Sequence, residues 1–135
     1  MNYWRFAICV PLTAVVLVVG EFAFIMSMGG RLMAARQAAG LPEFVPQPVL
    51  SILELLLTAT FITWLYVSIR PRFGAGAKTA AIAGVAAWAG LVLLSTVHMI
   101  GEGFGLPAPL LLTVAVIVLP IFVFSSVIGT ALYRE

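Results

Sequence analysis

The stretch AVVLVVGEFAFIM, residues 14–26, is an apolar run interrupted by a single carboxylate, Glu21. Apolar runs of this kind are typical of helices that lie in the hydrocarbon of a membrane. An ionisable side chain near the middle of a bilayer costs about 3 kcal/mol or more, so it is rarely there without a role. The fold therefore depends on whether the rest of the chain is equally apolar, and the function depends on what Glu21 meets.

The composition is that of a membrane protein. Of the 135 residues, 63% are hydrophobic and only 9% are charged, and the mean hydropathy is +1.18. Soluble domains carry roughly a quarter charged residues. A chain this short and this apolar has too few polar side chains to cover its surface in water. We therefore expect an integral membrane protein with a single domain and the lipid bilayer around it.

Several function classes are excluded by the residues that the chain lacks. The Lys and Arg residues lie at the ends of apolar runs and form no stripe with aromatic residues, so we expect no nucleic-acid binding. Cys9 is the only cysteine, which excludes an intrachain disulfide and a cysteine metal cluster. The chain has no Asp, no nucleophile beside a base and no phosphate-cradling glycine loop. We predict no catalytic residues, no metal, no cofactor and no enzymatic activity.

Four apolar stretches are long enough to cross a membrane as helices, for which about 20 residues suffice. Connectors rich in Gly and Pro separate them, so we expect spans near residues 4–30, 47–69, 77–101 and 108–133. Connectors this short join neighbouring antiparallel helices. The predicted fold of residues 1–135 is therefore all-α, an integral membrane four-helix up-down bundle. No cleavage site follows the first stretch, so we expect an uncleaved helix that continues to a stop at Gly40.

The basic residues predict the orientation of this bundle. The side with both termini and the middle connector carries five of them, whereas the other side carries Arg31 and Arg36. Because Lys and Arg favour the cytoplasmic side, we expect both termini in the cytoplasm, with an aromatic belt at the same boundary. The five basic residues are Arg5, Arg70, Arg72, Lys78 and Arg134, and the expected belt residues are Tyr3, Trp4, Trp64, Tyr66 and Tyr133.

The third and fourth spans contain features that affect packing. Gly76, Ala80 and Gly84 recur at four-residue spacing, which allows helix backbones to approach closely in lipid. This surface fits internal packing, and it also fits a homo-oligomer or a larger membrane complex. Pro120 lies within the fourth span and should kink it, which frees a carbonyl near Val116.

The polar residues within the spans gather in the predicted outer half. At 1.5 Å per residue, Glu21 and Glu54 fall at one level, roughly 10 Å below the outer surface, with His98 somewhat above them. Helical spacing predicts two polar stripes that face each other and Glu21. One is Gln47, Ser51, Glu54 and Thr58, and the other is Gly84, Trp88, Leu91, Ser95, His98 and Glu102. The candidate ligand or proton site is Glu21, Glu54, His98, Glu102, Ser51, Thr58 and Ser95.

Such a cluster is compatible with several roles. It can be a hydrogen-bonded polar core in which Glu21 and Glu54 share a proton. It can also be a pocket for a lipid, quinone or small amphiphile, or the relay of a proton-coupled exporter. A site with two Glu and one His suits a metal ion, although no E-x-x-H pair supports it. His98 alone can hold a haem or chlorin, or simply form a hydrogen bond in the core.

Part of the chain resembles a known group of proteins. The run LLLTATFITWLYVSIRPRFGAGAKTAAIAGVAAW, residues 55–88, and the ending VIGTALYRE, residues 127–135, are similar to small bacterial four-helix membrane proteins of uncharacterised function. The resemblance implies the bacterial inner membrane and four helices, and it implies no activity. The matching residues are Phe61, Trp64, Tyr66, Arg70, Arg72, Phe73, Gly74, Ala131, Leu132, Tyr133 and Arg134.

Two functions from different classes follow from these patterns. The small size, the short connectors and the missing catalytic groups favour a non-catalytic accessory or scaffolding subunit of a membrane complex. The competing hypothesis is a protein that binds a lipid, quinone or small amphiphile, or that couples transport to protons, through Glu21, Glu54 and His98.

Overall fold

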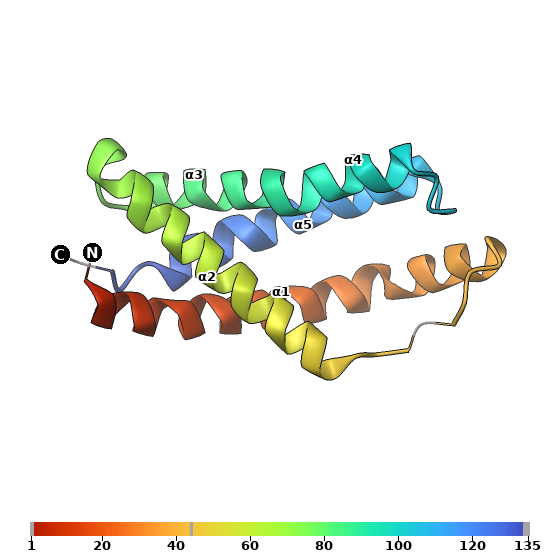
Figure 1. Ribbon diagram of the computed structural model, residues 1–135, viewed down its shortest axis with the longest axis horizontal. Coiled ribbons are helices and arrows are strands. Elements are labelled where there is room, and N and C mark those ends of the chain that lie inside the picture. The colour runs from red at the N-terminus through yellow and green to blue at the C-terminus, as the bar shows by residue number, and fades with distance from the viewer. Residues whose placement is uncertain (1, 44, 134–135) are drawn as a thin grey trace.

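The computed structural model describes residues 2–43 and 45–133, and all the regular structure within them is helical (Figure 1). Four helical stretches are long and apolar enough to cross a membrane. The fold prediction is thus confirmed as far as an all-helical chain with four long apolar helices. The helices are α1 (Tyr3–Ala38), α2 (Pro48–Phe73), α3 (Ala77–Trp88), the π-helical turn η1 (Ala89–Leu93), α4 (Leu94–Gly101) and α5 (Ala108–Gly129), with α3, η1 and α4 forming one continuous stretch.

The first helix is longer than a membrane span requires. It begins after Asn2, whose side-chain oxygen accepts a hydrogen bond of 3.2 Å from the backbone N–H of Arg5, as an N-cap does. It continues to Ala38 and stops before Gly40, which has a φ of +64°. Glycine adopts this left-handed conformation without strain, so it ends the helix where the sequence predicted.

The beginning and the end of the described chain lie together at one end of the bundle, called here the termini end. The backbone N–H of Asn2 donates a 2.9 Å hydrogen bond to the hydroxyl of Tyr133. The Tyr133 ring packs edge-on against Tyr66 at 6.2 Å, and the Arg70 guanidinium lies 5.3 Å from its centroid. Both tyrosines are buried beside Cys9. Arg134, which entered the orientation prediction, lies outside the described residues.

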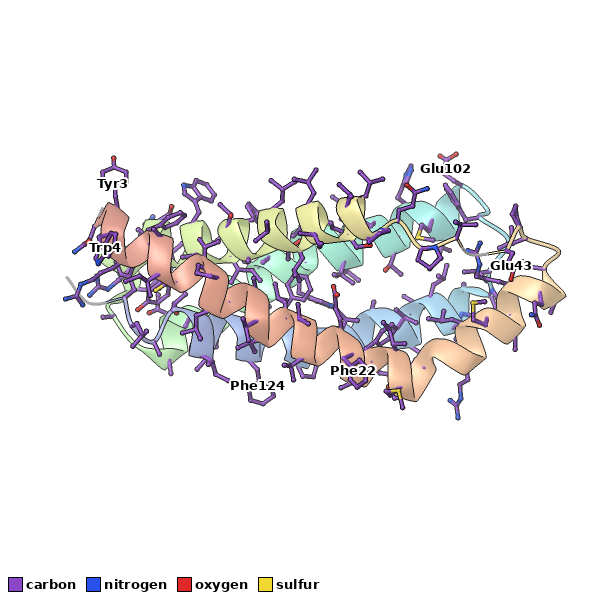
Figure 2. The ribbon with its side chains drawn as sticks, turned by 90° about the horizontal axis from the view of Figure 1, so that it is seen from below. Tyr3, Trp4, Phe22, Glu43, Glu102 and Phe124 are labelled. Carbon is purple, nitrogen blue, oxygen red and sulfur yellow. The ribbon has the colours of Figure 1, made fainter. Side chains whose placement is uncertain are left out.

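These contacts correct part of the predicted aromatic belt. Tyr3 and Trp4 are about three-quarters exposed and project from the termini end, as Figure 2 shows, which suits interfacial anchors. Tyr66 and Tyr133 instead belong to the core. Their hydroxyls find partners there, the N–H groups of Gly76 and Asn2 respectively, so their burial leaves no polar atom unpaired.

Close approaches hold α5 against α1 and α3. A Cβ atom added at Gly84 would lie 2.8 Å from the Phe122 carbonyl oxygen, and one added at Gly129 would lie 2.7 Å from the Cα of Thr13. Such spacing requires glycine, because any side chain would push the backbones apart. Ala80, Ala83 and Ala87 are fully buried on the same stretch as Gly84. One face of small residues on the third stretch therefore packs inside this chain, whereas Ala86 and Gly90 are exposed.

The opposite end of the bundle, called here the connector end, is looser. It contains the connectors before α2 and before α5, which meet where Leu41 lies beside Gly105. Helix α2 crosses the other helices obliquely in Figure 1, so its first turns lie away from the rest of the bundle. Apolar side chains on this part of the bundle are largely exposed: Val49 on α2 has an exposed fraction of 77%, and Met26 on α1 one of 73%. Glu43 and Glu102 also lie at this end (Figure 2).

Candidate functional site

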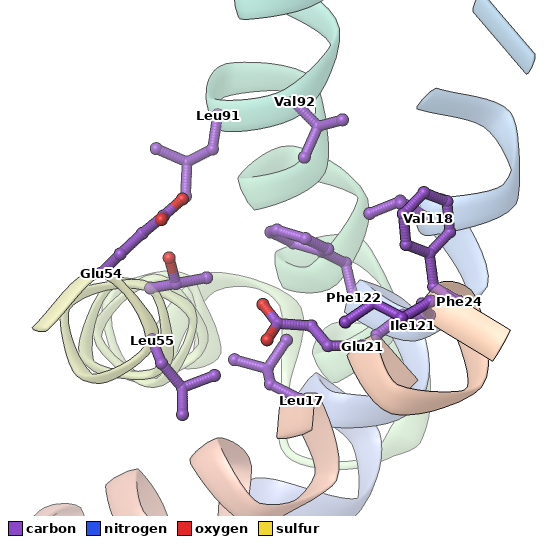
Figure 3. A pocket seen from close by; sticks show the side chains of 12 residues that line it. Leu17, Glu21, Phe24, Glu54, Leu55, Leu91, Val92, Val118, Ile121 and Phe122 are labelled. Atoms are coloured by element: carbon purple, nitrogen blue, oxygen red, sulfur yellow. The ribbon is translucent and has the colours of Figure 1, made fainter. Parts of the chain in front are cut away.

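Glu21 and Glu54 line one cavity, named here the inner cavity. It has a volume of about 350 Å³ and lies between α1, α2, η1 and α5. Figure 3 shows the Glu21 side chain pointing from α1 into this space and Glu54 reaching from α2 toward Leu91. The remaining lining is almost entirely apolar, apart from Thr58. It consists of Leu17, Phe24, Ile25, Leu55, Leu91, Val92, Val118, Ile121 and Phe122.

The helices around the inner cavity are held by contacts immediately beside it. Gly20, the neighbour of Glu21, packs directly against the side chain of Ile121 on α5. Trp88 donates a hydrogen bond of 2.7 Å from its indole nitrogen Nε1 to the carbonyl of Ala115, which ties α3 to α5. Pro120 lies within α5 next to three of the lining residues. The cavity thus lies beside the π-helical turn of the third stretch and beside Pro120, which has no backbone N–H to donate within α5.

A second cavity, named here the side groove, adjoins the inner cavity. It has a volume of about 620 Å³ and is lined by α2, by Leu91 of η1 and by Ser95 of α4. Glu54, Thr58 and Leu91 line both spaces. Glu54 therefore stands between the side groove and Glu21.

The electrostatics of the inner cavity are one-sided. Glu21 and Glu54 line the same space from two different helices. None of the described residues that line the inner cavity or the side groove is Lys, Arg or His. Among the described residues, no direct hydrogen bond joins Glu21 to Glu54 or to His98, the two partners expected from the sequence. The two carboxylates thus share a space whose described lining residues include no basic side chain to neutralise them.

The other predicted site residues lie elsewhere. His98 is exposed near the connector end, where its ring lies 6.5 Å from that of Phe104, and it does not line the inner cavity. Glu102 is exposed at the C-cap of α4. Ser51 donates to the carbonyl of Gln47 and Ser95 to that of Leu91, both within their own helical stretches. Of the candidate set, the inner cavity brings together Glu21, Glu54 and Thr58, while Ser95 lines the side groove.

The π-helical turn explains why His98 departs from the predicted stripe. An α-helix turns about 100° per residue, so fourteen residues would bring His98 back to within about 40° of Gly84. In η1 the N–H of Leu94 bonds to the carbonyl of Ala89, which inserts one extra residue into the turn. Every residue after η1 therefore lies about 100° around the helix axis from the position that it would take in an uninterrupted α-helix. Thr96 thereby takes the buried position, with 7% exposure, and His98 turns outward.

The arrangement does not resemble a metal centre. Among residues 2–43 and 45–133, no three His, Cys, Asp or Glu side chains lie close enough together to hold a metal ion. The site with two Glu and one His that the sequence left open would need His98 beside Glu21 and Glu54. The rotation at η1 places it away from them.

The sequence analysis missed a group of buried hydroxyls toward the termini end. Thr13 and Thr63 lie 3.3 Å apart between α1 and α2, and Ser126 donates a 2.6 Å hydrogen bond to the carbonyl of Ala80 across α5 and α3. Thr13 and Thr63 also donate to carbonyls of their own helices. Because Ser and Thr satisfy themselves in this way, they give little sequence signal of an interhelical contact.

Comparison of the chain with protein-family models, with curated proteins and with solved structures gave no significant match.

Proposed function

We propose that this chain is a multi-pass protein of the bacterial inner membrane, an up-down four-helix bundle with both termini in the cytoplasm. Support comes from its long apolar helices and from the exposed apolar side chains along them. Arg5, Arg70, Arg72 and Lys78 lie near the termini end, which agrees with the excess of basic residues on cytoplasmic sides.

Reporter fusions test this topology. A reporter enzyme that works only outside the cytoplasm should be active when joined after Arg36 and inactive when joined after Arg72. A reporter that works only in the cytoplasm should show the opposite pattern. Two junctions on the same side of the membrane would contradict the proposal.

We further propose that the protein binds a small amphiphile in the inner cavity. The observation that carries this proposal is a cavity of about 350 Å³ with apolar walls and two carboxylates from different helices. Ligand sites typically occupy about 300–1,000 Å³ and combine apolar walls with a few polar groups. A fully structural polar core would instead bring the carboxylates into direct hydrogen bonds. The apolar part of a ligand would lie against Leu17, Phe24 and Phe122, and its polar part near Glu21 and Glu54.

The side groove offers a route to this cavity from the flank of the bundle. It is lined on α2 by Leu50, Leu53 and Leu57, side chains that a bilayer would surround. An amphiphile dissolved in the membrane would reach Glu54 first and Glu21 beyond it. We therefore expect the ligand to come from the bilayer and not from water.

The test asks whether retention of a bound amphiphile requires an unfilled inner cavity. Protein purified in mild detergent is extracted with organic solvent, and the extract is compared by mass spectrometry with that of Leu91→Trp, which places a larger side chain in the lining of both spaces. Leu112→Trp, on an exposed part of α5 outside both linings, is the matched control. A species retained by the wild type and the control but lost from Leu91→Trp supports the proposal. Equal retention by all three contradicts it. The absorption spectrum of the same sample tests for haem or chlorin.

An accessory or scaffolding role is the second candidate. It is favoured by the exposed faces of α1 and α2 toward the connector end, where a partner helix could pack. Ala80, Ala83, Gly84 and Ala87 are packed within the chain, whereas Ala86 and Gly90 are exposed, so a homo-oligomer or a larger complex would use either these exposed small residues or the faces of α1 and α2. A partner that copurifies in fixed stoichiometry would support this role.

A further inference from the structure

We propose that the inner cavity and the side groove form one site for a lipophilic organic cation, whose charged group lies between Glu21 and Glu54. This inference rests on the proposed binding of an amphiphile. The two spaces adjoin, since Glu54, Thr58 and Leu91 line both of them. In the proposed site the ligand places its charge between the carboxylates and its apolar groups against the walls of both spaces.

Charge complementarity selects a cation. Two carboxylates from different helices face one space, and the described lining residues provide no basic side chain. A carboxylate in apolar surroundings is costly unless a counter-charge or hydrogen bonds compensate it. A single positive charge between Glu21 and Glu54 offsets both desolvation and mutual repulsion. A phosphate headgroup would add a further negative charge, so an anionic or zwitterionic lipid does not suit the site.

The walls select an organic cation over an inorganic one. Metal ions need several oxygen or nitrogen donors, and the described residues bring no three candidate side chains together. The inner cavity instead presents Phe24 and Phe122, and the side groove presents Phe61. Aromatic faces attract organic cations and also bury their apolar groups. The site therefore fits a charge that is spread over, or shielded by, hydrocarbon.

A pair of probes with one shape and opposite charges tests this inference. Tetraphenylphosphonium and tetraphenylborate differ mainly in the sign of their charge, and their binding to the whole protein in a neutral detergent is measured by isothermal titration calorimetry. We expect tetraphenylphosphonium to bind at least about tenfold more tightly than tetraphenylborate. Glu21→Gln and Glu54→Gln should each weaken tetraphenylphosphonium binding by about tenfold, since each removes one of the two charges. Glu102→Gln, which changes an exposed carboxylate outside both spaces, should leave it unchanged.

The occluding variant Leu91→Trp separates failure of this inference from failure of the proposed function. If both probes bind equally well and both are displaced by Leu91→Trp, the cavity binds amphiphiles without regard to charge, and the cation inference is overturned. If Leu91→Trp weakens the binding of neither probe, the probes do not bind in this cavity, and both proposals fail. Size-exclusion profiles of the Gln variants check that the bundle remains folded, because the amide has the same size as the carboxylate that it replaces.

Discussion

The indole N–H of Trp88 donates a 2.7 Å hydrogen bond to the carbonyl of Ala115 on the neighbouring helix. The donor, Trp88, lies immediately before the π-helical turn of the third stretch, and the acceptor, Ala115, lies five residues before Pro120. A backbone carbonyl in a regular helix already accepts a bond from its own helix, so a second donor from another helix is most useful where a proline has disturbed the pattern. The sequence predicted a freed carbonyl near Val116, and the structure places the donor on the adjacent one.

Trp88→Phe should destabilise the bundle. The ring is largely kept, but the Ala115 carbonyl loses its donor from α3, at a cost of about 1 kcal/mol. Thermal unfolding in detergent, followed by circular dichroism, should show a lower Tm. Trp4→Phe, at an exposed position of α1, should leave the Tm unchanged. Equal effects of the two substitutions would argue against a specific role for the Trp88–Ala115 bond.

Gly84→Ala should also destabilise the bundle, by about 1–3 kcal/mol. The added methyl group would lie 2.8 Å from backbone atoms of Phe122 and Val123, which cannot turn aside as a side chain can. Gly30→Ala is the control, because a Cβ at that position meets nothing within 4 Å. In the same unfolding assay the control should be neutral or slightly stabilising, since Ala favours helix. Loss of stability in both variants would mean that helix geometry, and not the contact with α5, is responsible.

Glu21→Gln should preserve the fold while removing any proton-linked activity. The amide fills the same space in the inner cavity but neither binds nor releases a proton. Glu21→Leu should also fold, because Glu21 makes no hydrogen bond to Glu54 or His98 that would be lost and an apolar side chain suits the apolar walls of the cavity. Elution profile and Tm report the fold, and uptake of protons into proteoliposomes reports the activity. Aggregation of the Gln variant would show that the carboxylate is structural.

The π-helical turn can be tested by labelling. Cys9, the only cysteine of the chain, is fully buried and should react slowly with a maleimide. Introduced cysteines therefore report their own exposure. We expect His98→Cys to label rapidly and Thr96→Cys slowly. Deletion of Gly90 should remove the extra residue and convert η1 into a regular α-helix, while α4 keeps its orientation, so His98→Cys should still label rapidly and Thr96→Cys slowly. A reversed order after deletion would mean that α4 had rotated and that η1 does not hold an extra residue.

The sequence predicted the parts of this fold that depend on distance along regular helices. Counting residues from the connectors placed Glu21 and Glu54 at one level, and both side chains line the inner cavity. Helical spacing placed His98 on the wrong face of its helix, because nothing in AGLVL, residues 89–93, signals a π-helical turn. Tyr66 and Tyr133 could not be assigned either. An amphipathic ring suits an interface as well as a core with a hydrogen-bond partner, and only the packing decides between them.

The bond between Asn2 and Tyr133 joins residues 131 positions apart, and helices α1 and α5 touch along much of their length. Chains are synthesised from the N-terminus at about 5–20 residues per second, so α1 waits on the order of ten seconds for the helix against which it packs. During that interval Gly20 and Thr13 are uncovered and the neighbouring Glu21 lacks its cavity. The nascent protein therefore carries Glu21 on a helix without its permanent neighbour until α5 has been made.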